Sequence, residues 1–493
     1  MLEKQVILTV FAAILAYLAY RSWRRTRTYE DFNLAGRKTG LFPMVCTLGA
    51  AEFNTATLIG GASVAYMYGT VGLYYTSLIF IFVFGIYAVT VAQPYRRLRI
   101  STIAEFFERR FHGPRGEATR AVASAITLTL TWMLPPIYLA GLSVITTVLL
   151  GIDPKVTVVG LVLFCLVLAL GGGFMTAISF DVVAYVMILV FIPVVFVIGW
   201  TQADGLSGLS NVFDPQYLSF SPVWDLEAYG FAAVLTWGFQ NIMSYIAAPW
   251  YGQRMFSARS AKVARTAMVI NTVLITLLYG LVAGTTMMAR VLVPDLKSPE
   301  EALPRLVVDY APSLLQGLIL VMLLLVGTST MIAIWNSAVS IATNDIARRY
   351  IVPGRSEGFY VKVGRGVFLA LGLSTLVVAL TIVGNIMLVL TYISVYSSLL
   401  AVPILAGLYW KRFTTNAALA AMVSGAIYVT IGLVVGFPYH LISPIGFAIS
   451  VVVGIVVTLA GPKQVPAEVE DFFLRVHGRS EGERGGEKDM AHV

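Results

Sequence analysis

The stretch from Leu41 to Gly69 is apolar and long enough to cross a lipid bilayer, which takes about 20 helical residues. Polar side chains nevertheless stand near its middle, namely Glu52, Asn54, Thr55 and Thr57. A charge at that depth is costly, so it normally faces the interior of a helix bundle and marks a pathway or a site. Glycines on both sides lower the helix propensity. We therefore expect a helix broken at the membrane midplane; the alternative is a continuous helix whose polar side chains contact its neighbours.

The composition predicts an all-α membrane protein with many spans. Of the 493 residues, 58% are hydrophobic and only 12% are charged, which excludes an ordinary soluble protein. The net charge of +8 is then no indication of nucleic-acid binding. Both cysteines fall inside apolar stretches and all four histidines fall outside them, so we expect neither a disulfide framework nor a buried histidine metal site.

About thirteen apolar segments are long enough to be transmembrane helices. They are Val6–Tyr20, Leu41–Gly69, Leu73–Val91, Val122–Leu150, Val156–Leu170, Phe180–Trp200, Gly230–Ala248, Ala264–Ala289, Ser313–Ile346, Val367–Val383, Ile386–Leu408, Ala417–Val435 and Leu441–Ala460. Arginines follow the first segment, whereas a cleaved signal peptide carries its positive charges before the apolar region. We therefore expect the first segment to be a retained helix.

The strongly basic connections between these segments would all lie on one side of the membrane. The basic residues are Arg21, Arg24, Arg25 and Arg27 after the first segment, Arg96, Arg97, Arg99, Arg109, Arg110 and Arg115 after Val91, Arg254, Arg259, Lys262 and Arg265 after Ala248, Arg348, Arg349, Arg355, Lys362 and Arg365 after Ile346, and Lys411 and Arg412 after Leu408. The positive-inside rule then predicts a multi-pass protein of the plasma (inner) membrane, with its N-terminus outside and its C-terminus in the cytoplasm.

A second polar interruption, Thr236–Asn241, suggests an internal duplication. It falls in the segment Gly230–Ala248, and four segments separate that segment from Leu41–Gly69. Two sets of five helices, each starting with a broken one, are typical of inverted repeats that bind substrate and ion at the midplane. Alternatively, these polar residues only line a helix contact. The expected division is an extra helix and basic loop (1–40), two repeats (41–225 and 226–412), two further helices (413–462) and a polar tail (463–493) that is disordered from about Gly478.

Several short motifs, in order and at suitable spacing, resemble those of one transporter family. They are Asp31–Arg37 (DFNLAGR), Gln253-Arg254, the run Ser329-Thr330, Trp335–Ala338 and Thr343–Asp345, and Gly407–Arg412 (GLYWKR). From Asp31 to about Ala460 the chain thus resembles the sodium/solute symporter family, which transports proline, pantothenate, sugars and sialic acid; Asn33 replaces an aromatic residue of the family motif. The resemblance implies a core of 5+5 helices like that of the leucine transporter, with one extra helix before it and two after it.

The resemblance also implies a sodium site between the first broken helix and the eighth core helix. Its ligands would be the carbonyl oxygens of Ala50, Phe53 and Val326 and the hydroxyls of Ser329 and Thr330. Oxygen ligands suit a hard cation, and a broken helix leaves carbonyls unpaired. Alternatively, the two hydroxyls bond to their own helix.

Asp181 matches an aspartate that some family members pair with a hydroxyl at a second sodium site. The positions for that hydroxyl are Ile332 and Ala333 here. We therefore expect one sodium ion per cycle, and we expect Asp181 to serve ion exit or gating.

The expected substrate residues come from both interruptions. They are Glu52, Asn54, Thr55, Thr57, Trp237, Gln240 and Asn241. No Lys or Arg falls in the middle of a predicted span, so we expect an amino acid or another zwitterionic or neutral solute. The predicted function is sodium-coupled import of a small polar solute across the lipid bilayer. The alternatives are a proton-coupled permease with Glu52 or Asp181 as proton carrier, and a membrane sensor with a transporter fold; nothing indicates an enzyme or a nucleic-acid partner.

Overall fold

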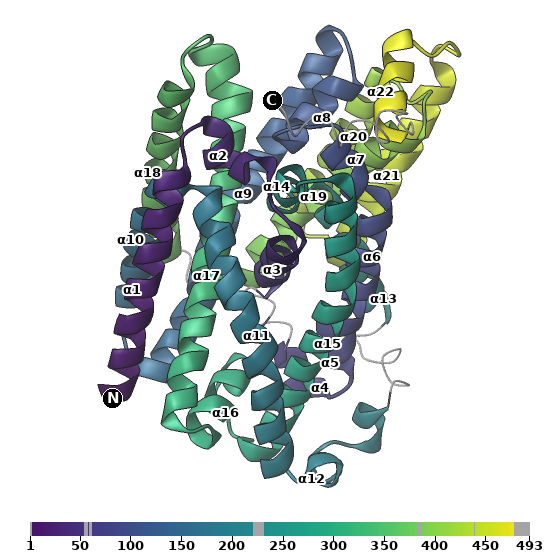
Figure 1. Cartoon of the computed structure of the whole chain (residues 1–493). Helices are drawn as coiled ribbons and strands as arrows, with labels where there is room; N and C mark the ends of the chain where they lie inside the picture. Colours follow the sequence, from purple (N-terminus) through teal and green to yellow (C-terminus); the bar gives the residue numbers. More distant parts are fainter. Residues whose placement is uncertain are drawn as a thin grey trace.

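The computed structural model describes residues 2–53, 58, 62–219, 231–381, 386–437 and 439–477, and these residues are mainly helical, with no β-strand among them. The helices pack side by side into one bundle (Figure 1). Those of the first half are α1 (Leu2–Arg25), α2 (Tyr29–Leu34), α3 (Leu41–Glu52), α4 (Ala62–Tyr68), α5 (Val71–Leu73), the π-helix η3 (Tyr74–Leu78), α6 (Ile79–Thr90), α7 (Ala92–Arg97), α8 (Ile103–Arg110), α9 (Pro114–Leu150), α10 (Pro154–Gly172), α11 (Phe174–Gln202) and α12 (Gly205–Val212). Those of the second half are α13 (Phe231–Ala247), α14 (Pro249–Ser257), α15 (Ala261–Leu292), α16 (Ala302–Tyr310), α17 (Ser313–Ser340), the π-helix η7 (Ile341–Ile351), α18 (Glu357–Thr381), α19 (Ile386–Tyr409), α20 (Thr415–Val435), α21 (Tyr439–Ala460) and α22 (Ala467–His477).

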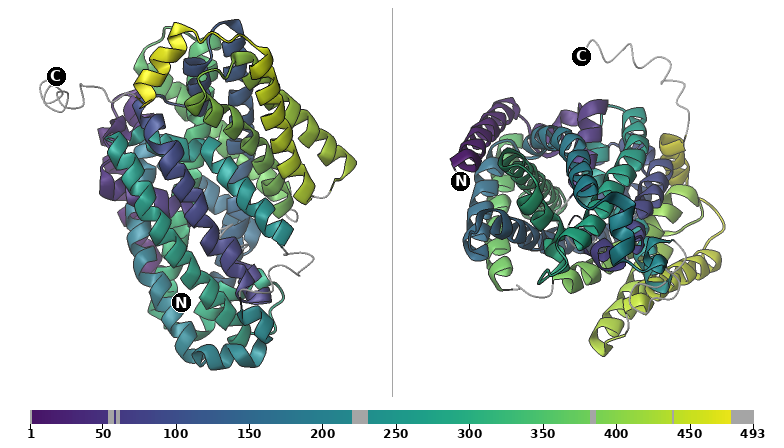
Figure 2. Two further views of the ribbon diagram at one scale, coloured as in Figure 1. Left: turned by 90° about the vertical axis from the view of Figure 1, so that its right-hand side faces the viewer. Right: turned by 90° about the horizontal axis from the view of Figure 1, so that it is seen from below.

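Each predicted span coincides with a helix or helix pair. Seven helices among the described residues are long and apolar enough to cross a membrane, so the predicted count of thirteen stays a prediction. The helix formed by α17 and η7 is central, since 89% of its most apolar 18-residue stretch is buried inside the protein. The corresponding share in α20 and in α21 is 33%, and both helices lie on the outside of the bundle (Figure 2).

The first predicted interruption is confirmed as the end of a helix. α3 stops at Glu52, because Phe53 leaves the helical conformation with a ψ of 41°, and α4 is described from Ala62 to Tyr68. Of the residues between them, the structure describes only Phe53 and Leu58. Asn54, Thr55 and Thr57 lie outside the described residues.

The second predicted interruption is wrong in position. Helix α13 runs unbroken from Phe231 to Ala247, through the whole of Thr236–Asn241. One glycine in that stretch, Gly238, costs only about 1 kcal/mol and does not end a helix. The break comes instead at Ala248, whose ψ is 117°, because the proline that follows disfavours helical backbone in the residue before it. Pro249 then starts α14, since a first helical residue needs no amide donor.

The first part of the tail contains a helix. Residues 467–477 form α22, in which Val469, Phe472, Phe473 and Val476 are buried. Their spacing gives the helix one apolar face, and that face packs against α7 and α8. The residues from about Gly478 onward, for which disorder is expected, lie outside the described residues.

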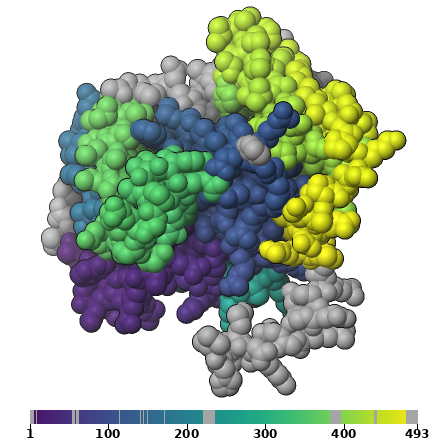
Figure 3. Space-filling model, turned by 90° about the horizontal axis from the view of Figure 1, so that it is seen from above, coloured from purple at the N-terminus to yellow at the C-terminus, as the bar shows by residue number. Residues whose placement is uncertain are grey.

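The basic connections meet at one end of the bundle, which we call the basic end (top of Figure 1; Figure 3). Hydrogen bonds join them across long sequence distances. Arg37 Nη1 donates to the Ile100 carbonyl oxygen at 2.9 Å, and Arg97 Nη1 donates to the Val476 carbonyl oxygen at 2.8 Å. The positive charges thus share one side, as the positive-inside pattern requires.

Gly49 lets α3 and α11 approach closely. A Cβ atom at this position would lie 2.1 Å from Cε2 of Tyr185, and a hydrogen bond of 3.1 Å from the Tyr185 hydroxyl to Asn271 Oδ1 holds that ring in place. Gly85 in α6 provides a contrast, because no atom lies within 4 Å of the corresponding Cβ position.

We therefore predict that Gly49→Ala lowers the stability of the protein by about 1–3 kcal/mol through overpacking. Gly85→Ala should leave stability unchanged or raise it by up to about 1 kcal/mol, because alanine has the higher helix propensity. Thermal unfolding of both variants in the same detergent measures the difference. A melting temperature of Gly49→Ala at or above that of the unmodified protein would contradict the close α3–α11 contact.

Candidate functional site

The carboxylate of Glu52 links the two helix interruptions. Glu52 is the last residue of α3 and is 1% exposed. Tyr245 in α13 donates its hydroxyl to Oε1 at 2.9 Å and to Oε2 at 2.8 Å, and Tyr251 in α14 also donates its hydroxyl to Oε2. These tyrosines stand on opposite sides of the break at Ala248. One buried carboxylate thus holds the end of α3 against both sides of the second break.

The backbone at the end of α3 has a partner of its own. The last carbonyls of a helix lack intrahelical amide partners. The hydroxyl of Tyr279 in α15 donates to the Glu52 carbonyl oxygen at 2.6 Å. The ring of Phe53 stacks on the ring of Tyr279, with centroids 4.5 Å apart and planes inclined by 12°. This contact fixes the first non-helical residue after α3.

A buried ion pair lies one turn before this end of α3. Arg254 Nη2 is 3.2 Å from Asp181 Oδ2, and both side chains are fully buried. Arg254 Nε also donates to the Thr47 carbonyl oxygen at 2.9 Å, and the Thr47 hydroxyl donates to Asp181 Oδ2. The pair therefore ties α14 to α3 and α11. The sequence analysis placed Arg254 in a basic connection between two helices, whereas the structure buries it against Asp181.

The expected sodium ligands on α17 are all buried. Ser329 Oγ donates to the Val326 carbonyl oxygen at 3.1 Å, and the carboxylate of Asp181 is close enough to interact with the same hydroxyl. Thr330 Oγ1 is buried and has no hydrogen-bond partner among the described residues. Ser329 thus bonds to its own helix, whereas the Thr330 hydroxyl does not.

The other two expected ligands, Ala50 and Phe53, are fully buried at the end of α3. α3 packs against α17 as well as α11. The four-residue spacing of a helix would pair the Ala50 carbonyl with Asn54 and the Phe53 carbonyl with Thr57, and both partners lie outside the described residues. The structure therefore brings the two helices of the expected site into contact.

Two of the expected substrate residues of α13 donate hydrogen bonds to backbone carbonyls, one in η3 and one in α13 itself. Trp237 Nε1 donates to the Tyr75 carbonyl oxygen at 3.3 Å, and Asn241 Nδ2 donates to the Trp237 carbonyl oxygen of its own helix at 2.8 Å. Gln240 is 2% exposed. The residues of α13 and α14 that reach Glu52 are instead Tyr245 and Tyr251. The sequence analysis missed them, although both lie within four residues of Pro249, where a helix break was to be sought.

Residues of separate sequence motifs meet in a polar cluster between α2, α14 and α17. Gln253 Nε2 donates to the Asn33 carbonyl oxygen at 2.9 Å and to Asn33 Oδ1 at 3.0 Å. Ser337 Oγ donates to Gln253 Oε1 at 2.8 Å, Asn336 Nδ2 donates to the Asn33 carbonyl oxygen at 3.1 Å, and Asn33 Nδ2 donates to Ser340 Oγ at 2.9 Å. The cluster is buried, so its hydrogen bonds hold three helices together without access of water.

Ion pairs join α8, α9 and η7 at the basic end. Arg120 Nη2 is 2.5 Å from Asp345 Oδ1, and Arg120 also pairs with Glu108. Arg349 Nη1 is 2.7 Å from Glu108 Oε1, and Arg349 also pairs with Glu117. Hydrogen bonds from Arg349 and then from Tyr350 lower the pKa of Glu117 to about 2, so this carboxylate stays ionised at neutral pH.

Comparison with known proteins identifies related transporters. Residues 32–425 match the family model described as the sodium:solute symporter family. The chain is 27% identical over 446 residues to the sodium/glucose cotransporter of Vibrio parahaemolyticus, with 81% of this chain and 78% of that protein covered. It is 23% identical over 497 residues to the osmoregulated proline transporter OpuE of Bacillus subtilis, with 96% and 97% covered.

Solved structures share the fold. A Na⁺-coupled sialic acid symporter, solved in a substrate-bound outward-open state, aligns with a TM-score of 0.79 at 19% identity and covers 93% of this chain and 98% of its own. Mhp1, a nucleobase-cation-symport-1 family transporter solved in a closed conformation, aligns with a TM-score of 0.58 at 15% identity and covers 90% and 98%. The all-α fold predicted from the sequence is thereby confirmed.

We predict that Tyr251→Phe lowers stability by about 1.5–3 kcal/mol, the usual worth of a hydrogen bond to a charged group. Tyr87→Phe is the matched control, because the Tyr87 ring lies 6.2 Å from that of Tyr251 and its buried hydroxyl has no partner in the described part of the chain. The control should melt at the same temperature as the unmodified protein or higher. Equal melting temperatures for the two variants would contradict the linking role of Glu52.

Proposed function

The chain belongs to the sodium:solute symporter family, and from that premise we propose that it imports a small polar organic solute, an amino acid or another zwitterionic or neutral metabolite. It is a multi-pass membrane transporter and a sodium-coupled symporter of a small organic solute, with Na⁺ as the coupling ion. Each Na⁺ that enters down a membrane potential of 100 mV supplies about 2.3 kcal/mol for solute uptake.

The proposed sodium site lies between the end of α3 and α17. Its ligands are the carbonyl oxygens of Ala50, Phe53 and Val326 and the hydroxyls of Ser329 and Thr330. The observation that carries this proposal is the buried Thr330 hydroxyl, which has no partner among the described residues, because such an orphaned oxygen is costly without a ligand. Ile332 and Ala333 offer no further hydroxyl, which supports one Na⁺ per cycle.

The nearby ion pair has a proposed role in ion release. Asp181 is close enough to interact with the Ser329 hydroxyl and is paired with Arg254. A Na⁺ ion that leaves Ser329 would meet a carboxylate already partly neutralised, which holds the ion only weakly. We assign Asp181 to ion exit and gating on this ground.

The proposed solute site lies beside Glu52. It includes Asn54, Thr55 and Thr57 after α3, and Trp237, Gln240 and Asn241 on α13. Glu52 supplies a carboxylate that suits the ammonium group of a zwitterion, and the bonds from Tyr245 and Tyr251 hold that carboxylate in place. The substrates of the related cotransporters, glucose, myo-inositol and proline, are small polar solutes of the same size class.

The proposed location is the plasma (inner) membrane. In the proposed topology the N-terminus is outside, and the basic end and the C-terminus face the cytoplasm. The polar cluster around Asn33 and Gln253 and the ion pairs of Arg120 and Arg349 lie toward the basic end. In alternating access these contacts close the cytoplasmic side while Na⁺ and solute enter from outside. They must break when the ion and solute leave.

We predict that the double variant Ser329→Ala/Thr330→Ala loses sodium stimulation of uptake. Its apparent sodium affinity should fall by about tenfold or more, because each contact of a hydroxyl with a charged group is worth about 1.5–3 kcal/mol. The control is Thr286→Ala in α15, which removes a buried hydroxyl that donates to the Ala283 carbonyl oxygen at 2.9 Å. Uptake into vesicles at graded sodium concentration is the measurement. Unchanged sodium dependence in the double variant rules out the site, and a Hill slope clearly above one rules out a single ion.

We predict that Glu52→Gln alters solute affinity, because the variant keeps the shape of the side chain but removes its charge. Thermal-shift screening of amino acids, sugars and carboxylates with and without Na⁺ first identifies the solute. Asp309→Asn, at an exposed carboxylate of α16, is the control and should leave uptake unchanged. Identical kinetics for Glu52→Gln and the unmodified protein across pH would exclude a direct role. Uptake driven by a pH gradient into sodium-free vesicles would instead indicate proton coupling.

A further inference from the structure

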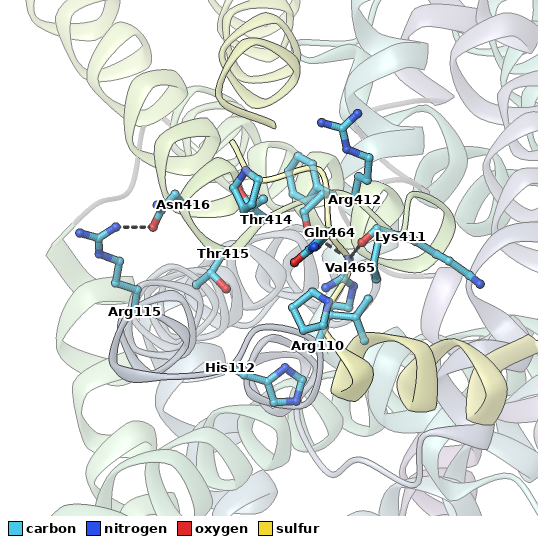
Figure 4. Close-up of a pocket in the computed structure, with 14 residues that line it drawn as sticks. Arg110, His112, Arg115, Lys411, Arg412, Thr414, Thr415, Asn416, Gln464 and Val465 are labelled. Carbon is cyan, nitrogen blue, oxygen red and sulfur yellow. Dashed lines mark hydrogen bonds between the residues drawn. The ribbon is translucent and has the colours of Figure 1, made fainter. Parts of the chain in front are cut away.

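A cavity of about 460 Å³ lies at the basic end, and none of the proposed sodium ligands lines it (Figure 4). The end of α8, the start of α9, the connection between α19 and α20, and the segment before α22 form its walls. Its ionisable lining residues are all basic, namely Arg110, His112, Arg115, Lys411 and Arg412. No Asp or Glu lines the cavity among the described residues. The cavity therefore has a positive electrostatic potential.

Arg110 places a buried positive charge in the wall of this cavity. Arg110 is 1% exposed, and its Nε donates to the Gly407 carbonyl oxygen at 2.7 Å. Its Nη2 lies within hydrogen-bond distance of the carbonyl oxygens of Phe413, at 3.0 Å, and of Trp410 and Lys411, both at 3.2 Å. Nη1 has no hydrogen-bond partner, and no carboxylate pairs with Arg110, in the part of the chain that the structure describes. Burial lowers the pKa of Arg110 to about 10, so the guanidinium stays protonated at neutral pH. The carbonyl oxygens at and just after the end of α19 satisfy Nε and Nη2 but carry no full negative charge, so Nη1 is left to interact with an anion.

The first turn of α20 adds amide donors to the same wall. Thr414 caps the helix, and its Oγ1 accepts from the Ala417 amide at 3.1 Å. The amides of Thr415 and Asn416, which both line the cavity, make no hydrogen bond to the described residues. The positive end of the helix dipole favours an anion at such a position. Arg115 Nη1 donates to Asn416 Oδ1 at 2.7 Å, which keeps a second guanidinium at the rim (Figure 4).

We propose that this cavity binds a phosphate group, through the free Nη1 of Arg110, the first amides of α20 and the surrounding basic side chains. Charge-assisted bonds from guanidinium groups, together with backbone amide donors at a helix N-terminus, are the usual chemistry of phosphate recognition. The phosphate can belong to an anionic phospholipid or to a soluble phosphate compound. The apolar residues Val423, Val456 and Leu459 are exposed on α20 and α21, the helices that begin or end at the cavity, and acyl chains of a lipid would lie along them.

The test compares two pairs of charge-removing substitutions in the full-length protein. Lys411→Gln/Arg412→Gln removes one lysine and one arginine from the cavity wall. Arg355→Gln/Lys362→Gln removes the same two charges from exposed positions at the basic end that do not line the cavity. All four side chains lie at or near the surface of the protein, so both variants should fold. The second variant therefore controls for net charge.

Each source of the phosphate has its own probe. For lipid, the protein is purified from nanodiscs of phosphatidylcholine with phosphatidylglycerol, and native mass spectrometry measures the phosphatidylglycerol that stays bound. For a soluble compound, inorganic phosphate is titrated into delipidated protein at constant ionic strength, and the melting temperature is measured against chloride.

We expect binding in one of these assays to fall about tenfold or more in Lys411→Gln/Arg412→Gln, since each basic residue near an anionic headgroup contributes about 1 kcal/mol. The control variant should bind as the unmodified protein does. Loss of phosphatidylglycerol retention supports the lipid source, and loss of stabilisation by phosphate supports the soluble source. If the cavity variant and the control behave alike with both probes, the cavity is not a phosphate site.

Discussion

The carboxylate of Glu52 is the group on which the arrangement of the core depends. A buried carboxylate is stable only when hydrogen bonds replace the water that it lost. Here the donors are hydroxyls from two different helices, Tyr245 before the break at Ala248 and Tyr251 after it. Because the Glu52 carboxylate accepts both hydrogen bonds, the end of α3 cannot separate from the second break without losing them. The same hydrogen bonds fix the C-terminal end of α3, which packs against α17.

The polar contacts of the core follow the short sequence motifs that identify the family. Asn33, Gln253, Asn336 and Ser337 come from three motifs, and the structure joins them in one hydrogen-bonded cluster. In a low-dielectric interior, such a cluster is rigid when its groups are satisfied and costly when they are separated. A transporter must pass between two arrangements of its helices, and contacts of this kind make each arrangement distinct rather than continuously variable.

Hydropathy located the main helices well, because a membrane helix must be apolar over a length that one-dimensional patterns show directly. It also identified Glu52 as an ionisable residue in the middle of an apolar segment. It misplaced the second break, because polar residues in α13 were weighed more heavily than the backbone restriction imposed by Pro249. It also missed the burial of Arg254, since the partner Asp181 lies 73 residues away and only tertiary packing brings the two together. The apolar face of α22 was visible in the spacing from Val469 to Val476 but was overlooked among polar neighbours.

The break at Ala248 is a single non-helical residue, and the helix that follows it has only nine residues. That short helix bears Tyr251, which bonds to Glu52 beside the proposed solute site. It also bears Gln253, which belongs to the polar cluster, and Arg254, which pairs with Asp181 near the proposed sodium ligands. Since a helix of this length moves as a rigid rod, a tilt about its one-residue joint shifts all three contacts together. The proposed ion site, the proposed solute site and the polar cluster are thus in contact with one short helix, through which a movement at one of them would reach the other two.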